Sequence, residues 1–268
     1  MTRPDLLDLW DETAQDLLTV LRELTPEDHE RPALPGWTVT DVLAHLAHLE
    51  AAAAGMEPPA GAEVDVEPST NQPMPTDVTE AGVAARRDRS AAALLEEFET
   101  ACARRREVLA DLDTSDLKAA APGLAGRLGW DVGTWLRNRP IDLWVHEQDV
   151  RAATGRPLTT TGEGAVHVAG LMTRAFPMAL RRLPVGTGVI ARISGPQGRV
   201  IAARVGKDGR AAPFDPDEAK GDETVLAMED ITWLRLTGGR LDPVEAEVEV
   251  TGDEQVAAAV LRRLNVTP

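Results

Sequence analysis

The spacing of apolar residues changes partway along the chain, and this change constrains the fold more than any other feature of the sequence. In the first part, apolar side chains recur every three or four residues, which is the period of an amphipathic helix. Later segments, such as 189–193, 199–205 and 245–250, show the two-residue period of a strand. The chain of 268 residues is also long enough for two domains. We therefore predict a helical domain over residues 1–157 and an α+β domain over residues 165–268.

The first domain is predicted to be a four-helix bundle. The helical pattern is carried by residues 4–24, 37–55, 79–111 and 130–154. Thr38 and Asp41 have the spacing of a capping box at the start of the second of these helices. Pro140 is expected to kink the fourth helix or to mark a local restart. Residues 56–78, which hold five prolines, are expected to form one long crossover loop.

The second domain is predicted to combine helices with a sheet. Residues 165–183 form one more apolar helix, and the segments 189–193 and 199–205 flank a Ser-Gly-Pro-Gln-Gly turn as a hairpin would. The remaining predicted elements are strands at 224–228 and 245–250 and helices at 230–236 and 253–264. This mixture of elements is typical of an α+β domain.

The acidic composition argues against two classes of partner. With 28 Lys and Arg against 44 Asp and Glu, the net charge is −16, so nucleic acid and anionic membranes would repel the chain. The single cysteine, Cys102, excludes an internal disulfide and fits a reducing compartment. The N-terminus lacks the basic and apolar regions of a signal peptide, and no apolar run approaches the ~18 residues of a membrane span. We therefore expect a cytoplasmic protein with small-molecule partners.

Two histidines and one aspartate have the pattern of a metal site. Asp142 and His146 are four residues apart in a predicted helix, so both project from the same face. His45, from the helix predicted over residues 37–55, would supply a third ligand. Two nitrogen donors and one carboxylate leave an open position on a tetrahedral zinc ion, which is typical of catalytic sites. Water or a thiol would bind there.

A simpler interpretation of these residues is also open from the sequence. In so acidic a chain, roughly half of all histidines have an acidic residue one helical turn away by chance. His146 could therefore belong to an ion pair or a helix cap, or be a core histidine whose ring nitrogens are hydrogen-bonded. Two features favour the metal site. Apolar residues flank both His45 and His146, and Asp41 and Asp149 lie one turn from a proposed ligand. Each aspartate could orient the second ring nitrogen of that ligand.

The other charged and polar residues are expected to be structural. The arginines at 86–87 and 104–106 fit solvated helix faces. His29 and His167 lie outside the metal pattern and are expected to be structural or exposed. Cys102 lies outside it as well, so any reactive sulfur would have to come from a cofactor.

Two segments of the chain resemble a known family. They are Pro35-Gly-Trp-Thr-Val-Thr-Asp-Val-Leu-Ala-His45 and Asp142-Leu-Trp-Val-His-Glu-Gln-Asp-Val-Arg-Ala-Ala-Thr-Gly-Arg156. Both resemble the mycothiol-dependent maleylpyruvate isomerase family, within the DinB-like metal-binding superfamily, and the resemblance covers nearly the whole chain. It implies an N-terminal four-helix bundle that binds a divalent metal, commonly zinc. It also implies a C-terminal α+β domain of the sterol-carrier-like kind.

The resemblance implies roles for individual residues. The metal triad of the family falls on His45, Asp142 and His146. The founding isomerases have glutamate where this chain has Asp142, a departure that shortens the reach and bears on the substrate more than on metal binding. An arginine that faces the active site in the family matches Arg240 better than Arg235. The alternative for Arg240 is a charge at the C-terminal end of a helix.

Two further residues are predicted to contact the cofactor. His48 lies one turn after His45 and is expected to line the pocket rather than to bind the metal, since only His45 matches the motif. Trp144 is the second, although a tryptophan in such a segment more often packs a core.

The function implied is that of an enzyme that uses a low-molecular-weight thiol, mycothiol, together with a small electrophile. Metal coordination would lower the pKa of the thiol so that the thiolate attacks the electrophile. Addition to a cis-diacid followed by elimination would be an isomerisation, and addition alone would be an S-transfer. Two alternatives stay open: a metal-free module that binds an apolar ligand, and a stress-linked protein that binds metal without turnover. The sequence makes no prediction of the oligomeric state.

Overall fold

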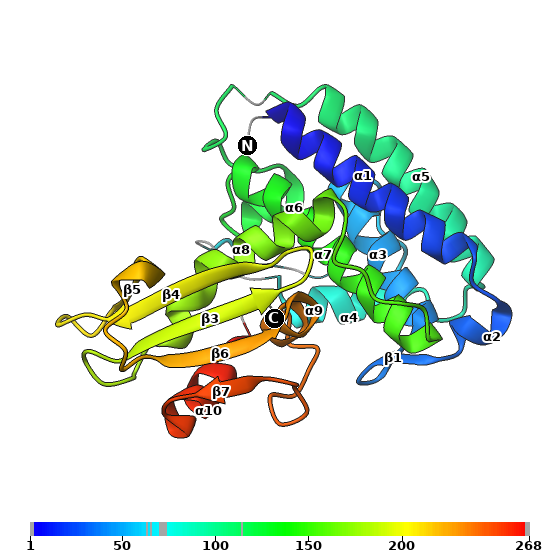
Figure 1. Cartoon of the computed structure of the whole chain (residues 1–268). Helices are drawn as coiled ribbons and strands as arrows, with labels where there is room; N and C mark the ends of the chain where they lie inside the picture. Colours follow the sequence, from blue (N-terminus) through cyan, green and yellow to red (C-terminus); the bar gives the residue numbers. More distant parts are fainter. Residues whose placement is uncertain (1–2, 63, 65, 70–73, 114, 266–268) are drawn as a thin grey trace. The chain divides into compact units, whose positions relative to one another are not determined.

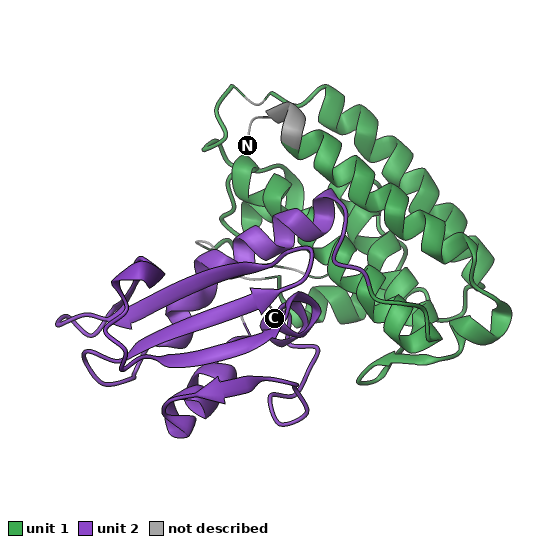
Figure 2. Ribbon diagram, in the orientation of Figure 1, with its two compact units in different colours: residues 1–158 green, residues 159–268 purple. Residues whose placement is uncertain are grey.

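The computed structural model describes residues 3–62, 64, 66–69, 74–113 and 115–265. The chain folds into two compact units, residues 1–158 and residues 159–268 (Figure 2). The first unit is mainly helical and the second contains a five-stranded sheet, so the chain is a mixed helical and sheet protein (Figure 1). Each unit is described in turn.

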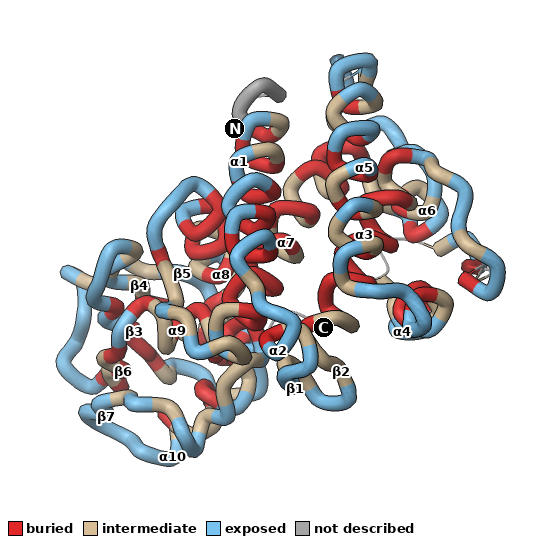
Figure 3. Tube along the Cα trace, turned by 90° about the vertical axis from the view of Figure 1, so that its right-hand side faces the viewer, coloured by how far each residue is buried: buried red, intermediate tan, exposed pale blue. Residues whose placement is uncertain are grey.

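Four long helices make up most of the first unit. Within it, α1 packs against α7 and α3 packs against α5, while α1 also contacts α5 and α3 contacts α7. Their inward faces are buried (Figure 3) and share one hydrophobic cluster that includes Leu17, Leu43, Phe98 and Leu136, one residue from each helix. The elements of this unit are α1 (Arg3–Arg22), α2 (Pro26–His29), β1 (Pro32–Leu34), β2 (Trp37–Thr38), α3 (Val39–Ala53), α4 (Thr76–Ala84), α5 (Ala91–Ala110), α6 (Gly123–Arg127) and α7 (Val132–Thr154).

Capping residues fix the ends of the two helices that carry the predicted metal ligands. The predicted capping box is present, because the Thr38 hydroxyl accepts from the backbone N–H of Asp41 and the Asp41 carboxylate accepts from the backbone N–H of Thr38. At the start of α7, the Asp131 carboxylate accepts from the backbone N–H of Thr134. Gly155 ends α7 with a φ of 70°, a conformation that favours glycine. Helix α7 continues through Pro140, so the proline does not restart it.

The single helix predicted over residues 79–111 is wrong. The structure has two helices there, because α4 ends at Ala84 and α5 begins at Ala91 after a cap at Ser90. The Ser90 hydroxyl accepts from the backbone N–H of Ala93. Both helices have apolar residues at helical spacing, so the periodicity alone gave no sign of the break between them.

The second unit is built around a sheet of order β5-β4-β3-β6-β7. The predicted hairpin is present as β3 and β4, and β3 also pairs in parallel with β6, with Ile190 opposite Val225. Helices α8 and α9 pack against this sheet, and Phe176 of α8 meets Trp233 of α9 edge to face. The elements are α8 (Glu163–Ala179), β3 (Gly188–Ser194), β4 (Arg199–Val205), β5 (Ala211–Pro213), β6 (Thr224–Glu229), α9 (Asp230–Thr237), β7 (Glu249–Thr251) and α10 (Glu254–Leu261), with a short 3-10 turn at Pro216–Glu218.

The alternating segment at 245–250 is a strand only at its end. Strand β7 covers Glu249–Thr251 and pairs antiparallel with β6 at the edge of the sheet. The three residues of β7 are exposed. Extension of the strand towards residue 245 would therefore gain little stability from burial of one face. Strand β5, the opposite edge, was not predicted. Within the described part of the chain, no helix is long and apolar enough to cross a membrane.

Candidate metal centre

Three of the predicted site residues meet between α3 and α7. The Nε2 atom of His45 lies 3.5 Å from Oδ1 of Asp142, and the Nε2 atom of His146 lies 3.6 Å from the same oxygen. The two imidazole rings are edge to face, with centroids 4.8 Å apart. One ligand atom from each residue lies within 4.8 Å of the other two. Two imidazole nitrogens and a carboxylate oxygen that converge in this way are a donor set suited to a divalent cation such as zinc.

The hydrogen bond at the far side of His146 fixes its tautomer. Its Nδ1 lies 2.9 Å from Oδ2 of Asp149, which is also buried. A carboxylate only accepts, so Nδ1 carries a proton, and the lone pair that Nε2 has in this tautomer is directed to Oδ1 of Asp142. Two lone pairs that face each other in a buried site repel unless a proton or a cation lies between them. The residues therefore fit a metal ion, and Asp149 has the orienting role predicted for it.

His45 is held differently from His146. Its ring lies 5.2 Å, centroid to centroid, from the indole of Trp37 at the start of α3. Burial lowers the pKa of His45, and the nearby carboxylate of Asp142 only partly opposes this, so the imidazole is neutral and able to bind a metal at neutral pH. The prediction that Asp41 orients this ring is wrong. The Asp41 carboxylate is instead used in the cap of α3 and lies 3.8 Å from Arg87.

Asp142 is the most exposed member of the triad. Its side chain keeps 28% of its accessible surface, whereas both histidines are buried. The Nη1 atom of Arg139 donates to Oδ2 of Asp142 over 3.0 Å. Burial would raise the pKa of Asp142, but the charge of Arg139 holds it well below its usual value. The carboxylate is therefore ionised and ready to bind a cation.

His48 lies one turn further along α3 and is not part of the triad. Its Nδ1 accepts from Nη1 of Arg86 over 3.2 Å, because a guanidinium can only donate, and Nε2 therefore carries the proton. Burial, assisted by the charge of Arg86, lowers the pKa of His48 to about 4. The ring lines a pocket of about 480 Å³ together with Arg127 and Leu124. Contact of His48 with a cofactor stays a prediction.

The absence of a side chain at Gly82 makes room for the His48 ring. A Cβ atom at Gly82 would lie 2.2 Å from Cδ2 of His48. We expect Gly82→Ala to lower the free energy of unfolding by about 1–3 kcal/mol, because this overlap outweighs the better helix propensity of alanine. Chemical denaturation measures the change. Gly170→Ala in α8 is the matched control, since a Cβ there meets no atom within 4 Å and should leave the protein as stable or more stable. Equal effects of the two substitutions would contradict the packing.

The buried His48 should make stability depend on pH. Its pKa is about 4 in the folded protein against a usual 6.5, so the unfolded chain binds a proton between these values that the folded chain does not. Stability is therefore complete above the unfolded value and falls as the pH is lowered towards 4. We expect urea unfolding of the metal-free wild type to lose more free energy between about pH 7 and about pH 5 than that of His48→Gln. The same pH dependence in both proteins would contradict this assignment.

Trp144 does not reach the triad, and Arg240 belongs to the other unit. Trp144 lies between Asp142 and His146 in sequence and projects from the opposite side of α7. It is buried, and its Nε1 atom has no hydrogen-bond partner among the described residues. Arg240 is in the second unit, where its Nη1 donates to the carbonyl of Gly238 over 2.9 Å. The roles of Trp144 and Arg240 towards a cofactor or substrate stay predictions.

A chain of buried charges behind the triad was missed in the sequence. Glu50 has no exposed side-chain surface and pairs with Nη1 of Arg105 over 2.6 Å and with Nη2 of Arg139 over 2.7 Å. The prediction of solvated arginines at 86–87 and 104–106 is therefore wrong for Arg86 and Arg105, which are buried. Burial would raise the pKa of Glu50, but the two guanidinium groups lower it below its usual value.

A sequence signal for this chain of charges exists. Arg105 falls on the stripe of α5 that also carries Leu94, Phe98, Cys102 and Leu109. A charged residue on an apolar stripe is buried, and burial is costly unless a group of opposite charge is buried beside it. The position of Arg105 therefore indicates a buried carboxylate nearby.

Comparison with known proteins identifies the family of the chain. The sequence profile of the mycothiol maleylpyruvate isomerase N-terminal domain matches residues 10–151, more than half of the chain. The chain therefore belongs to the mycothiol maleylpyruvate isomerase family. Among curated proteins no sequence matches the chain.

Two solved structures share the fold of nearly the whole chain. The crystal structure of the mycothiol-dependent maleylpyruvate isomerase has a TM-score of 0.61 at 16% identity, covering 94% of this chain and 93% of that one. A histidine-to-alanine mutant of that enzyme gives a TM-score of 0.59 at the same identity and coverage. At this identity the similarity establishes the fold, and the chemistry has to be argued from the site.

Proposed function

We propose that this protein is a metal-dependent enzyme that uses mycothiol, or a thiol like it, to act on a small electrophile. The observation that carries the proposal is the convergence of His45, Asp142 and His146 on one point, with the Nε2 lone pair of His146 facing a carboxylate oxygen. Membership of the family supports the choice of thiol. We further propose that residues 1–157 form a DinB-like four-helix bundle and that residues 165–268 form a sterol-carrier-like domain.

Each residue of the centre has a defined task in this proposal. A divalent ion, for which we propose zinc, supplies an open coordination position and lowers the pKa of a bound thiol so that thiolate is present at neutral pH. His45, Asp142 and His146 hold the ion, and Asp149 keeps the His146 ring in the tautomer that leaves Nε2 free. The burial of both imidazoles keeps competing water away from the donor atoms.

The sulfur nucleophile comes from the cofactor in this proposal. Cys102 is buried, and burial raises the pKa of its thiol far above the usual value, so it is not a nucleophile. A thiolate that adds to the double bond of a cis-diacid forms a carbon–sulfur bond and leaves a single bond free to rotate. Elimination then breaks the carbon–sulfur bond and returns the thiolate with the trans product. Protonation of the adduct instead of elimination gives a stable thioether, which is the product of an S-transferase.

The second unit and the pocket residues have proposed parts in substrate recognition. We propose that the guanidinium of Arg240 binds a carboxylate of the substrate, which suits the planar, bidentate geometry of arginine. His48 and Trp144 are proposed to contact the thiol. We propose that the protein acts in the cytoplasm.

A thiol-consumption assay tests the proposed activity. The purified protein, loaded with zinc, is mixed with mycothiol and a panel of small electrophiles that includes cis-diacids, and free thiol and substrate geometry are both followed. Loss of thiol indicates S-transfer, and a cis-to-trans change without loss of thiol indicates isomerisation. Metal binding without either change would favour a non-catalytic stress protein. Retention of an apolar ligand by a protein that binds no metal would favour the metal-free alternative.

A further inference from the structure

The carboxylate of Asp142 has two oxygens in different surroundings. Oδ1 faces Nε2 of both His45 and His146, at 3.5 and 3.6 Å. Oδ2 accepts a hydrogen bond from Nη1 of Arg139 over 3.0 Å. Arg139 precedes Asp142 by almost one turn of α7, so the two side chains lie on the same face of the helix. One oxygen is thus left for a cation and the other is held by the protein.

Arg139 is itself held by a buried carboxylate. Its Nε and Nη2 donate to Oε1 of Glu50 over 3.1 and 2.7 Å, which orients the planar guanidinium and leaves Nη1 to reach Asp142. The other oxygen of Glu50 accepts from Arg105 over 2.6 Å. The guanidinium of Arg105 lies over the rings of Trp10 and Trp135, 4.8 and 5.2 Å from their centroids. The hydrogen bonds therefore run from the centre of the helical unit to the metal triad.

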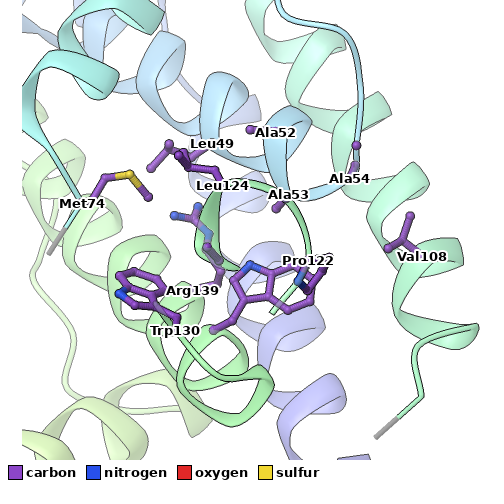
Figure 4. A pocket seen from close by; sticks show the side chains of 14 residues that line it. Leu49, Ala52, Ala53, Ala54, Met74, Val108, Pro122, Leu124, Trp130 and Arg139 are labelled. Atoms are coloured by element: carbon purple, nitrogen blue, oxygen red, sulfur yellow. The ribbon is translucent and has the colours of Figure 1, made fainter. Parts of the chain in front are cut away.

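The surroundings of Arg139 offer the guanidinium few other acceptors. Its side chain lines a small pocket of about 170 Å³ whose other described lining residues, such as Leu49, Leu124 and Trp130, are apolar (Figure 4). Because the side chain is buried as well, the pairs with Glu50 and Asp142 account for its position. Two guanidinium groups face two carboxylates, so the chain of charges is balanced before a metal ion binds.

We propose that Arg139 is a positioning residue for the metal centre: it holds Oδ2 of Asp142, so that Oδ1 is aimed between His45 and His146, and Glu50 fixes Arg139 in turn. This inference rests on the proposed function, because it assumes a cation at the triad. The inference predicts the direction in which the loss of Arg139 changes metal affinity. A cationic group beside a dication lowers metal affinity if charge is all that it contributes. A group that orients a ligand raises metal affinity despite its charge.

Two substitutions of Arg139 in the full chain measure the direction of the change in zinc affinity. Arg139→Met keeps the length of the side chain and removes both charge and hydrogen bonds, while Glu50 keeps Arg105 as a one-to-one partner. Arg139→Lys keeps the charge but cannot donate to Glu50 and Asp142 in the same forked geometry. Zinc affinity is measured by competition with a chromophoric chelator. We expect Arg139→Met to bind zinc about 10- to 100-fold more weakly than wild type, with Arg139→Lys in between.

Arg105→Met is the matched control. It makes the same change at the other arginine of Glu50, one step further from the triad, and leaves Arg139 and Glu50 as a one-to-one pair. We expect its zinc affinity to stay within about threefold of wild type, although it should unfold more easily because a buried ion pair is broken. Circular dichroism and thermal unfolding of each metal-free variant show that it is folded at the temperature of the zinc titration.

Three results would overturn the inference. Zinc binding by Arg139→Met as tight as in wild type, or tighter, would show that Arg139 acts only as a nearby charge. An equal loss in Arg139→Met and Arg105→Met would show a general effect of the buried charges on stability. Wild-type protein that binds no zinc would overturn the proposed function as well, which distinguishes that failure from the first two.

Discussion

Replacing His146 with alanine should remove the bound metal ion and, with it, thiol-dependent activity. His146 supplies one of three ligand atoms, and among the described residues its Nε2 atom faces Oδ1 of Asp142, which is an acceptor. An alanine leaves one imidazole and one carboxylate, which is too few protein ligands for a catalytic zinc site. We expect the metal content of the purified protein to fall from about one ion per chain to about none. Elemental analysis after gel filtration measures it.

The control for His146→Ala is the same substitution at a histidine of the same unit. His29→Ala is suitable, because His29 lies in the short helix α2 and is not part of the triad. We expect this variant to keep its metal and its activity. A His146→Ala protein that stays folded and retains wild-type metal content would contradict the assignment of the centre.

Replacing Glu50 with glutamine should cause a large loss of stability. Glu50 is fully buried, and its carboxylate is the shared partner of Arg105 and Arg139. The neutral amide leaves the buried guanidinium of Arg105 without a compensating charge, while Arg139 keeps only Asp142. Breaking a buried ion pair in this way costs about 3–5 kcal/mol. For a protein of this size that corresponds to a fall of about 10 °C or more in Tm. Thermal unfolding of the metal-free protein measures it.

Glu99→Gln is the matched control for this prediction. It removes the same charge from an exposed pair, because Glu99 meets Arg22 where both side chains are well exposed. Exposed ion pairs contribute about 0–1 kcal/mol, so Tm should change little. If Glu50→Gln were as stable as Glu99→Gln, the buried chain of charges would not contribute to stability in the way described.

The residues that meet at the centre were predictable because helical spacing constrains them closely. Asp142 and His146 are four residues apart, and Asp149 follows after three more, so a correctly predicted helix α7 places all three on one face. The capping box at Thr38 likewise fixed the start of α3 and therefore the direction of His45. Family resemblance selected His45 over His48, and the hydrogen bond of Arg86 to His48 gives a physical reason for that choice.

The features that were missed depend on contacts between segments distant in the sequence. Glu50 meets Arg105 and Arg139 from two other helices. The apolar stripe around Arg105 indicates that this arginine is buried, but it does not show which carboxylate pairs with it. The break between α4 and α5 depends on the Ser90 cap within a segment whose apolar pattern is helical on both sides. Strand β7 is short because its residues lie at an exposed sheet edge, which strict alternation in sequence does not reveal.

The central claim is that the triad holds a metal ion with a position open to a thiol, and cobalt substitution tests it most directly. Cobalt(II) reports its ligands in its absorption spectrum, so the cobalt-loaded protein is titrated with mycothiol while the spectrum is recorded. We predict a sulfur-to-metal charge-transfer band that saturates at about one thiol per chain and is absent from His146→Ala. A wild-type protein that binds no cobalt, or a cobalt spectrum that mycothiol leaves unchanged, would contradict the claim.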